Sequence, residues 1–324
     1  MTKLSITLAC EKYDFLRPLM EQEVMPEGID LRIIQVVPTT GLAAARHQRM
    51  YRFEEYDAAE FALVGHMVAV SRGELLHRAI PCFPRRMFPH KFIAVRTDRG
   101  IESVYDLAGK RVGIVNWENT LQLPLRRALA EQYGLQKDAI HWVVSNKGVV
   151  GVERIEGVRI EVEPSGRKLE DLLLEGKLDA VALPFIIDAV VNGDHRVRSL
   201  FPDVQTQERK YFEMTGHFPL MHDIVIKQSI LEREPWVAHS LVDALKESRR
   251  RYLHWMEQPT NLTFAWGREQ LLEERKLFGT SQWEEGFQAT RAQVQIMCDL
   301  AYDQGALAKR VTPEDLFVTS TLDT

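Results

Sequence analysis

Apolar and polar residues alternate along the first 95 residues in a way that predicts strands and helices in turn. Residues 4–9 place an apolar side chain at nearly every second position, which is typical of a strand with one buried face. By the same reasoning we expect strands at 30–36, 58–63, 77–82 and 92–96, and helices over 13–22 and 41–52. This order predicts a largely parallel sheet with helices on its faces.

A second set of alternating segments begins at residue 111. We expect strands at 111–115, 140–144, 159–163 and 178–183, and helices over 120–133 and 169–175. Gly134 directly follows the first of these helices, at a position where glycine commonly ends a helix. A strand at 218–226 then leads back, and the remainder is expected to be helical over 235–256, 268–278, 286–304 and a short segment after Thr312.

This path predicts two α/β lobes, with lobe one formed by 1–95 plus 219–324 and lobe two by 96–218. A chain that leaves one lobe, builds another and returns matches the type 2 periplasmic-binding-protein-like fold. In that fold two mixed or parallel sheets are flanked by helices, two crossing strands form a hinge, and a ligand binds in the cleft between the lobes. The fold alone does not fix the function, because transport receptors and enzymes both use it.

Composition narrows the class of partner. The 324 residues are 45% hydrophobic and 27% charged, which is ordinary for a soluble protein of more than one lobe. A net charge of −5 argues against a nucleic-acid partner, since phosphate binding requires a basic face. Arginine and histidine residues between positions 83 and 99 instead suggest a local site for a small anionic ligand. The oligomeric state stays open, with a homo-oligomer among the alternatives.

The cysteines and the N-terminus bear on the compartment. Cys10, Cys82 and Cys298 are far apart and lack metal-ligand spacing, so we expect buried free thiols. The apolar run before Cys10 is too short for an export signal, and no run is long enough to cross a membrane. We therefore expect a cytoplasmic protein, or a periplasmic one if an export signal ahead of Met1 has been removed.

Short motifs occur from the first lobe to the end of the chain. In sequence order they are Glu27-Gly28-Ile29-Asp30-Leu31, Asp57-Ala58-Ala59-Glu60, Ile80-Pro81 with Phe83-Pro84, Arg86-Met87-Phe88 with His90, Phe201-Pro202-Asp203, Thr215-Gly216, Phe218-Pro219, Met221-His222, Pro235-Trp236-Val237-Ala238, Phe278-Gly279, Trp283, Gly286, Arg291, Gln304-Gly305 and Leu316-Phe317. On these motifs the chain resembles the 4,5-dihydroxyphthalate decarboxylase family over nearly its whole length. The resemblance implies decarboxylation of a hydroxylated aromatic acid on the two-lobed fold.

Several positions expected near the ligand differ from the family pattern. The family favours an arginine where this chain has Phe15, and it often has another arginine near Pro184, where this chain has none. It also tends to have serines and a tyrosine shortly after Glu60, where this chain has His66 among apolar residues. The resemblance therefore implies the reaction class more strongly than the substrate.

Decarboxylation of a phenolic acid needs few groups. An acid must protonate the carbon that carries the carboxylate, a base or acceptor must engage the phenol, and cations must hold any second carboxylate. We expect no metal or organic cofactor, because the ring itself can accept the electrons.

Residues on the two expected crossings are candidates for these roles. His222 is the first candidate for the proton donor, since imidazole changes protonation near neutral pH; a structural histidine at the hinge is the alternative. Arg86 could bind a carboxylate through two parallel hydrogen bonds, and His90 lies on the same crossing; for Arg86 the alternative is a salt bridge between the lobes. Arg85 is expected to point elsewhere, into solvent.

Four further residues lie near expected strand ends. Glu118 and Thr120 precede a helix N-terminus: Glu118 could take a phenolic proton or favour the helix dipole, and Thr120 could contact substrate or cap the helix. Glu60 could contact substrate at the end of its strand or pair with a buried cation. His66, on the turn that follows, is a weaker substrate-binding candidate.

Two other functions remain open from the sequence. One is a solute-binding protein that holds a small anionic or aromatic ligand without chemistry. The other is a different lyase on the same fold.

Overall fold

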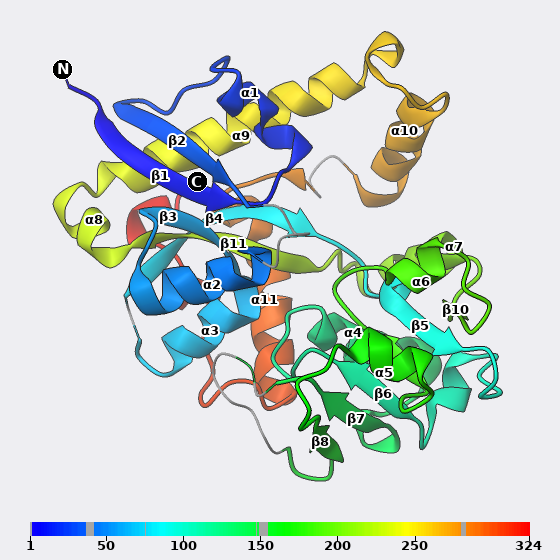
Figure 1. Ribbon diagram of the computed structural model, residues 1–324. Helices are drawn as coiled ribbons and strands as arrows, with labels where there is room; N and C mark the ends of the chain where they lie inside the picture. The colour runs from blue at the N-terminus through cyan, green and yellow to red at the C-terminus, as the bar shows by residue number, and fades with distance from the viewer. Residues whose placement is uncertain (1, 37–41, 75, 147, 149–154, 280–282) are drawn as a thin grey trace.

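The computed structural model describes residues 2–36, 42–74, 76–146, 148, 155–279 and 283–324 and contains two sheets flanked by helices (Figure 1). The first sheet has five strands in the order β2–β1–β3–β11–β4. Their bounds are β1 (Leu4–Cys10), β2 (Ile29–Gln35), β3 (Ala58–Ala62), β4 (His77–Arg86) and β11 (Leu220–Lys227). Strand β1 is parallel to β2 and β3, whereas β11 runs antiparallel to β3 and β4.

The second sheet has six strands in the order β10–β5–β9–β6–β7–β8. Their bounds are β5 (Ile93–Arg96), β6 (Arg111–Ile114), β7 (His141–Val144), β8 (Ile160–Val162), β9 (Ala180–Ala182) and β10 (Val197–Ser199). The boundary expected after residue 95 would place most of β5 in lobe one. Its hydrogen bonds to β9 and β10 place it in the second sheet, so that sheet begins before residue 96.

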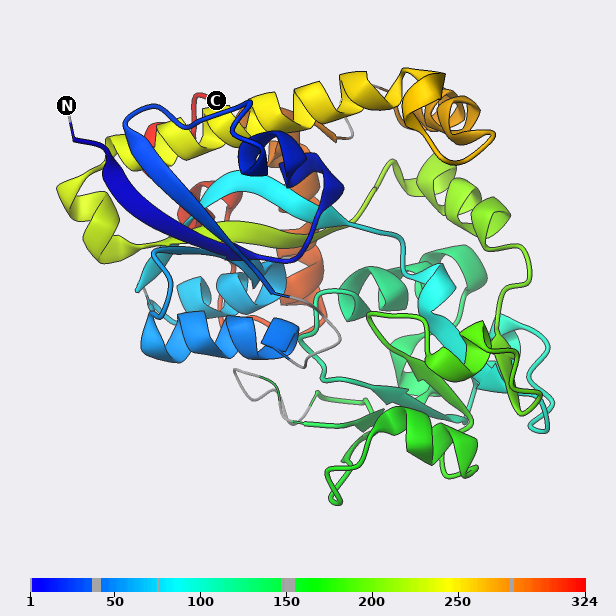
Figure 2. The ribbon, with the colours of Figure 1, turned by 45° about the horizontal axis from the view of Figure 1, so that its top comes forward.

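Helices cover both faces of each sheet (Figures 1 and 2). Their bounds are α1 (Arg17–Met20), α2 (Leu42–Phe53), α3 (Leu63–Ser71), α4 (Gln122–Tyr133), α5 (Leu169–Leu174), α6 (Asp188–Val191), α7 (Val204–Thr215), α8 (Gln228–Arg233), α9 (Trp236–Met256), α10 (Gly267–Phe278), α11 (Phe287–Asp303) and α12 (Pro313–Leu316). One core of the first lobe packs α9 against the sheet, and a separate core packs α2, α3 and α11 on the other face. Residue 41, the first of the helix expected over 41–52, lies outside the described residues.

Local sequence explains how the main elements form. Helix α9 buries Val237, Leu241 and Leu245, which share one helical face. Helix α4 ends at Gly134, whose φ of 70° is the left-handed conformation expected there. The three cysteines are buried and free, as the sequence predicts.

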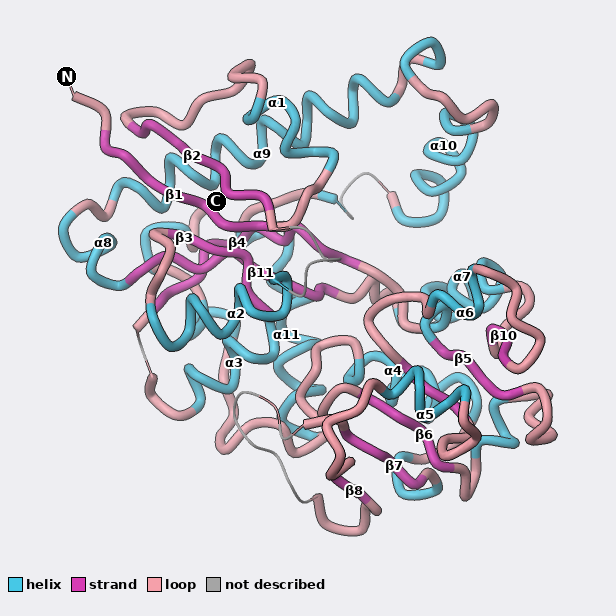
Figure 3. The backbone as a smooth tube through the Cα atoms, viewed as in Figure 1, coloured by secondary structure: helices cyan, strands magenta, loops and turns pink. Residues whose placement is uncertain are grey.

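Two segments connect the lobes, and they are hydrogen-bonded to each other. One runs from β4 to β5, and the other runs from α7 back to β11 (Figure 3). The Met87 amide donates to the Pro219 carbonyl at 3.1 Å, which joins the two segments. The first sheet is therefore completed by a strand, β11, that follows the entire second sheet in the sequence. Among the described residues, no helix has the length and apolar character needed to cross a membrane.

A buried cluster around Gln304 provides another connection between the lobes. Gln304 follows α11, and its Oε1 accepts a hydrogen bond from Arg126 Nε at 2.5 Å. Its Nε2 donates to the Leu123 carbonyl at 2.9 Å, and its own carbonyl accepts from Trp117 Nε1 at 2.9 Å. The Arg126 guanidinium stacks on the Trp117 ring at 3.8 Å. The end of α11 is thus fixed to α4 and to the loop before it.

Replacing Gln304 by Ala should lower the free energy of unfolding by about 2–4 kcal/mol, because two side-chain hydrogen bonds are lost and buried Arg126 loses an acceptor. Urea unfolding measures this change. Gln295→Ala is the matched control, since among the described residues that side chain bonds only Asp299 on its own helix. Equal losses in the two variants would contradict a stabilising role for the cluster.

Candidate functional site

Glu60 and His222 meet near the centre of the first sheet. Glu60 lies on β3 and His222 on the neighbouring β11, and Oε1 of Glu60 contacts Nδ1 of the His222 ring. Tyr13 Oη donates to the same Oε1 at 2.6 Å, and the Glu11 amide donates to Oε2 at 2.8 Å. Arg46 Nη2 lies 3.2 Å from Oε2. A carboxylate with no exposed surface is thus fully supplied with donors.

These donors determine the charge of Glu60. Burial by itself would raise its pKa, but the charge and hydrogen bond of His222, followed by Arg46 and Tyr13, lower the pKa well below its usual range. Glu60 therefore remains ionised throughout the neutral range.

The other ring nitrogen of His222 is available to a ligand. The side chain is 12% exposed, and no described residue forms a hydrogen bond with Nε2. Because Glu60 holds Nδ1, the ring has a fixed orientation with Nε2 directed away from the carboxylate. A histidine held in this way can donate a proton to a molecule bound beside it.

His47, on α2, completes the surroundings of His222. The two rings meet edge to face with centroids 5.1 Å apart. Burial, followed by the charges of Arg46 and His222, lowers the pKa of His47 well below its usual value. His47 is therefore neutral at pH 7.

Two guanidinium groups flank the carboxylates. Arg46 has no exposed surface and also donates from Nε to the Glu60 carbonyl at 3.1 Å. Arg85 lies on β4 directly opposite His222 on β11. Its Nη1 donates to Glu11 Oε1 at 3.4 Å, and its Nη2 donates to the Pro184 carbonyl, in the loop after β9, at 3.1 Å. Arg85 therefore joins the site to the second lobe.

Glu11, Glu60 and His222 are the described residues that could hold a metal ion, with one ligand atom from each within 4.8 Å of the others. Arg46 contacts both of these carboxylates, and Arg85 contacts that of Glu11. A divalent cation would have to compete with both guanidinium groups. The two guanidinium groups therefore oppose metal binding at these carboxylates.

Arg86 lies in a different cluster from the neighbouring Arg85, since adjacent residues of a strand face opposite sides. Its Nη2 donates to the Glu284 carbonyl at 2.6 Å and lies 3.6 Å from Glu285, which also binds Arg249 at 2.7 Å. Burial lowers the pKa of Arg86 to about 10, although the charge of Glu285 partly opposes this shift. The structure thus places Arg86 in an ion-pair cluster within the first lobe, away from Glu60.

His90 is also separate from Glu60 and His222. Its Nε2 lies 2.9 Å from Gln132 Oε1, and its ring packs among Tyr133, Phe201 and Tyr211. Burial lowers the pKa of His90 to about 4, although the bond to Gln132 partly opposes this shift. The geometry is that of a buried, neutral histidine.

This lowered pKa predicts acid sensitivity. Between pH 6.5 and 4 the unfolded chain binds a proton at His90 that the folded protein does not, so stability should fall as the pH falls through this window. From pH 7 to 5 the contribution is about 2 kcal/mol. Urea unfolding at both pH values should show that the free energy of unfolding falls by about 2 kcal/mol less in His90→Phe than in the wild type. The exposed control His195→Gln should match the wild type, and an undiminished drop in His90→Phe would contradict the prediction.

The remaining three candidates are also buried, each against different residues: Thr120, Glu118 and His66. Thr120 Oγ1 accepts from the Val64 amide at 3.3 Å, so it caps the first turn of α3 rather than its own helix. Glu118 is buried against Gly148. His66 Nδ1 lies 2.7 Å from the carboxylate of Asp223, the residue after His222. The structure brings only Glu60 and His222, of the seven sequence candidates, into direct contact.

Three residues of the site were missed by the sequence interpretation: Tyr13, Arg46 and His47. A fourth, Arg85, was expected to point into solvent but bonds Glu11 and the Pro184 carbonyl. Tyr13 follows the end of β1, a position where open α/β sheets commonly contact ligands, and this was the available signal. Arg46 and His47 lie on a predicted helix whose inward face could not be related to Glu60 without the fold.

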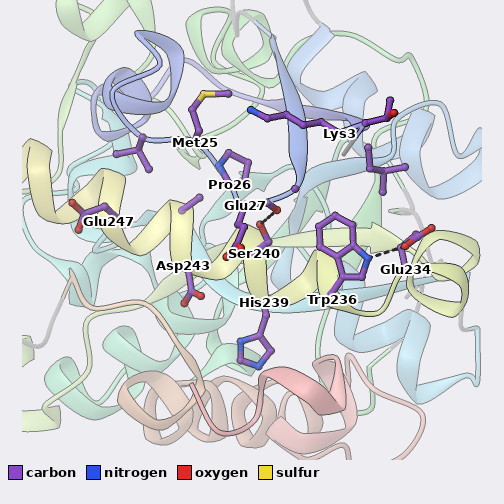
Figure 4. A pocket seen from close by; sticks show the side chains of 15 residues that line it. Lys3, Met25, Pro26, Glu27, Glu234, Trp236, His239, Ser240, Asp243 and Glu247 are labelled. Atoms are coloured by element: carbon purple, nitrogen blue, oxygen red, sulfur yellow. Dashed lines mark hydrogen bonds between the residues drawn. The ribbon is translucent and has the colours of Figure 1, made fainter.

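A large open hollow of about 940 Å³ lies elsewhere, between the start of β1 and α9 (Figure 4). Its rim includes the carboxylates of Glu27, Glu234 and Asp243. Trp236 donates to Glu234 at 2.7 Å and Ser240 donates to the Glu27 carbonyl at 2.8 Å, so these side chains are bound to their neighbours. The acidic rim would repel an anionic ligand, so this hollow is a poor candidate for binding an aromatic acid.

Sequence comparison identifies the family. The chain is 30% identical to 4,5-dihydroxyphthalate decarboxylase of Comamonas testosteroni over 331 aligned residues, which cover 100% of this chain and 99% of that protein. This protein belongs to the 4,5-dihydroxyphthalate decarboxylase family. The decarboxylase of the same name from Pseudomonas putida is 33% identical over 63% of this chain and 80% of its own length. Residues 67–158 match the family described as NMT1/THI5 like.

Structural comparison confirms the type 2 periplasmic-binding-protein-like fold. The alkanesulfonate-binding protein SsuA from Xanthomonas axonopodis pv. citri, bound to MOPS, aligns over 99% of this chain and 98% of its own, with a TM-score of 0.55 and 15% identity. A mutant of DSZB in complex with biphenyl-2-sulfinic acid aligns over 99% of both chains, with a TM-score of 0.54 and 13% identity. At these identities the likeness establishes the fold alone.

Proposed function

We propose that this member of the 4,5-dihydroxyphthalate decarboxylase family is a carboxy-lyase that removes carbon dioxide from a hydroxylated aromatic acid, with no requirement for a metal or organic cofactor. The observation that carries the proposal is the Glu60–His222 pair, which holds one imidazole nitrogen and leaves the other free to donate. Full-length similarity to a decarboxylase supports the reaction class.

In the proposed reaction the ring supplies the electrons and His222 supplies the proton. The phenolic oxygen pushes electron density into the ring, and the proton on Nε2 is transferred to the carbon that carries the carboxylate. The bond between this carbon and the carboxylate then breaks, its electron pair returns to the ring, and carbon dioxide leaves. A proton from solvent restores His222. The substrate exchanges one carboxylate for one hydrogen, with no net oxidation or reduction.

Glu60 acts in this scheme as a positioning residue. It has no exposed surface and is saturated by His222, Tyr13, Arg46 and the Glu11 amide, so it would not contact the substrate itself. Its role is to fix the His222 ring and to stabilise the imidazolium form, as a carboxylate does for the histidine of a catalytic triad.

The charge of the surroundings suits an anionic substrate between the lobes. The charges of Glu11 and Glu60 balance those of Arg46 and Arg85, so protonation of His222 gives the group a net charge of +1. The structural relatives show that the fold accommodates organic anions, in one case an aromatic sulfinic acid.

A solute-binding protein is the second candidate, because the fold is shared along the whole chain with a sulfonate-binding protein. One assay separates the two. Purified protein is incubated with a panel of hydroxylated benzoic and phthalic acids while carbon dioxide release and the melting temperature are recorded. We expect carbon dioxide release from at least one acid, unchanged by EDTA. Thermal stabilisation without carbon dioxide release would favour the binding protein.

A further inference from the structure

Arg85 lies beside the proposed proton donor, at the junction of the lobes. It is the β4 residue paired with His222 on β11, and its Nη2 reaches the Pro184 carbonyl of the second lobe at 3.1 Å. Its Nη1 donates to Glu11 Oε1 at 3.4 Å, and a carboxylate oxygen of Glu11 lies within 4.8 Å of a ring nitrogen of His222. A group bound by Arg85 would therefore lie within reach of the His222 ring.

The two guanidinium groups of the site differ in what they can still bind. Arg46 has no exposed surface and is held against Glu60 by both a hydrogen bond and an ion pair. The Arg85 side chain is 25% exposed, and its contact with Glu11 is a single one at 3.4 Å. A guanidinium carries five N–H donors, and the described residues accept from Arg85 through only two of them.

We propose that Arg85 binds a carboxylate of the substrate, specifically one that the reaction leaves in place. This inference rests on the proposed function. The departing carboxylate must lose its charge to become carbon dioxide, so a guanidinium bound to it would stabilise the ground state and slow the reaction. Binding a carboxylate that stays on the ring does not slow the reaction in this way, and it orients the ring for protonation.

Neighbouring residues are consistent with an aromatic ring at this position. Phe185 and Ile186 directly follow Pro184 and are large apolar side chains with 47% and 46% of their surface exposed. They supply apolar surface next to the carbonyl that Arg85 contacts. A carboxylate on Arg85 would thus place the attached ring between His222 and the Pro184 loop. Glu11 competes with the substrate for the same guanidinium.

Binding of benzoate, which lacks the hydroxyl group needed for reaction, tests this role by isothermal titration calorimetry. Arg85→Gln should weaken benzoate binding about 10- to 100-fold, the usual effect of losing charge-assisted hydrogen bonds. Arg85→Lys should recover part of this loss, because it restores charge without the planar pair of donors. Glu11→Gln should strengthen binding, since it removes the competing carboxylate, and a purely structural Arg85 would not produce that change.

The controls separate binding from turnover. Arg49→Gln, which alters an exposed pair with Glu55, should bind benzoate as the wild type does. Benzamide, a neutral analogue, should bind weakly and without dependence on Arg85. Unchanged benzoate affinity in Arg85→Gln, or no benzoate binding by the wild type, would overturn the inference. Arg85-dependent binding in a protein that releases no carbon dioxide would refute the proposed function but leave Arg85 as the carboxylate ligand.

Discussion

Replacing His222 by Asn should lower kcat for decarboxylation by about 10²–10⁴-fold, the range expected when a general acid is removed. An asparagine amide can still donate to Glu60 in place of Nδ1, but it has no titratable proton in place of Nε2. Benzoate affinity should change little, because the proposed carboxylate ligand is Arg85. Steady-state kinetics at saturating substrate, together with calorimetric titration of benzoate, measure the two quantities separately.

His254→Gln is the matched control for this variant. His254 is an exposed residue of α9 that pairs with Glu257, and its replacement should leave kcat unchanged. If His222→Asn retained wild-type kcat with normal affinity, another group would have to be the proton donor.

Replacing Glu60 by Gln should lower the free energy of unfolding by about 3–5 kcal/mol, the usual cost of breaking a buried ion pair from one side. The variant removes the nearer of the two carboxylates that face the fully buried Arg46, which keeps only the longer contact to Glu11 at 3.7 Å, and it weakens the bonds to Tyr13 and His222. The pKa of Glu60 is depressed, so its stabilisation is fully present above about pH 4.5 and is lost as the pH falls below that value. Urea unfolding at pH 7 measures the effect.

A second pair provides the comparison for Glu60. Glu55→Gln disrupts an exposed contact with Arg49 and should cost less than about 1 kcal/mol. The double variant Glu60→Gln/Arg46→Met should regain part of the stability, because it removes the uncompensated charge. If Glu60→Gln unfolded at the same urea concentration as Glu55→Gln, the carboxylate would have no such structural role.

Elements with clear periodicity could be predicted from sequence. The strand expected at 4–9 is β1, and the helix expected over 235–256 is α9, because each has one apolar face at the period of its conformation. The helix expected over 120–133 is α4, which begins two residues later than expected. The helix expected over 13–22 is instead a short 3-10 turn followed by α1, with Pro18 near the start of α1.

Elements without periodicity could not be predicted in the same way. Helix α3 was not expected, because eight of its nine residues are buried and its apolar side chains form no single stripe. Strand β4 continues to Arg86, beyond the expected end at residue 82, although Pro84 usually disfavours a strand interior. Helix α7 has a mixed polar sequence and was also missed.

This extension of β4 explains why the site was only partly predictable. In a loop, either Arg85 or Arg86 could face the ligand, whereas in a strand with β11 as its neighbour Arg85 is the residue paired with His222. Glu60 and His222 could be selected because each lies on an expected strand near the lobe junction. Tyr13 and His47 come from separate segments, and only the folded chain brings them to the same place.

Decarboxylation in D₂O tests the central claim most directly. The wild type and His222→Asn are incubated with 4,5-dihydroxyphthalate and with the hydroxybenzoic acids of the panel, and the products are examined by mass spectrometry and NMR. We predict that the wild type releases one carbon dioxide per product molecule and places one deuterium on the carbon that lost the carboxylate, and that His222→Asn does so far more slowly. Recovery of every acid intact, in a protein that nevertheless binds benzoate, would contradict the assignment as a decarboxylase of these acids.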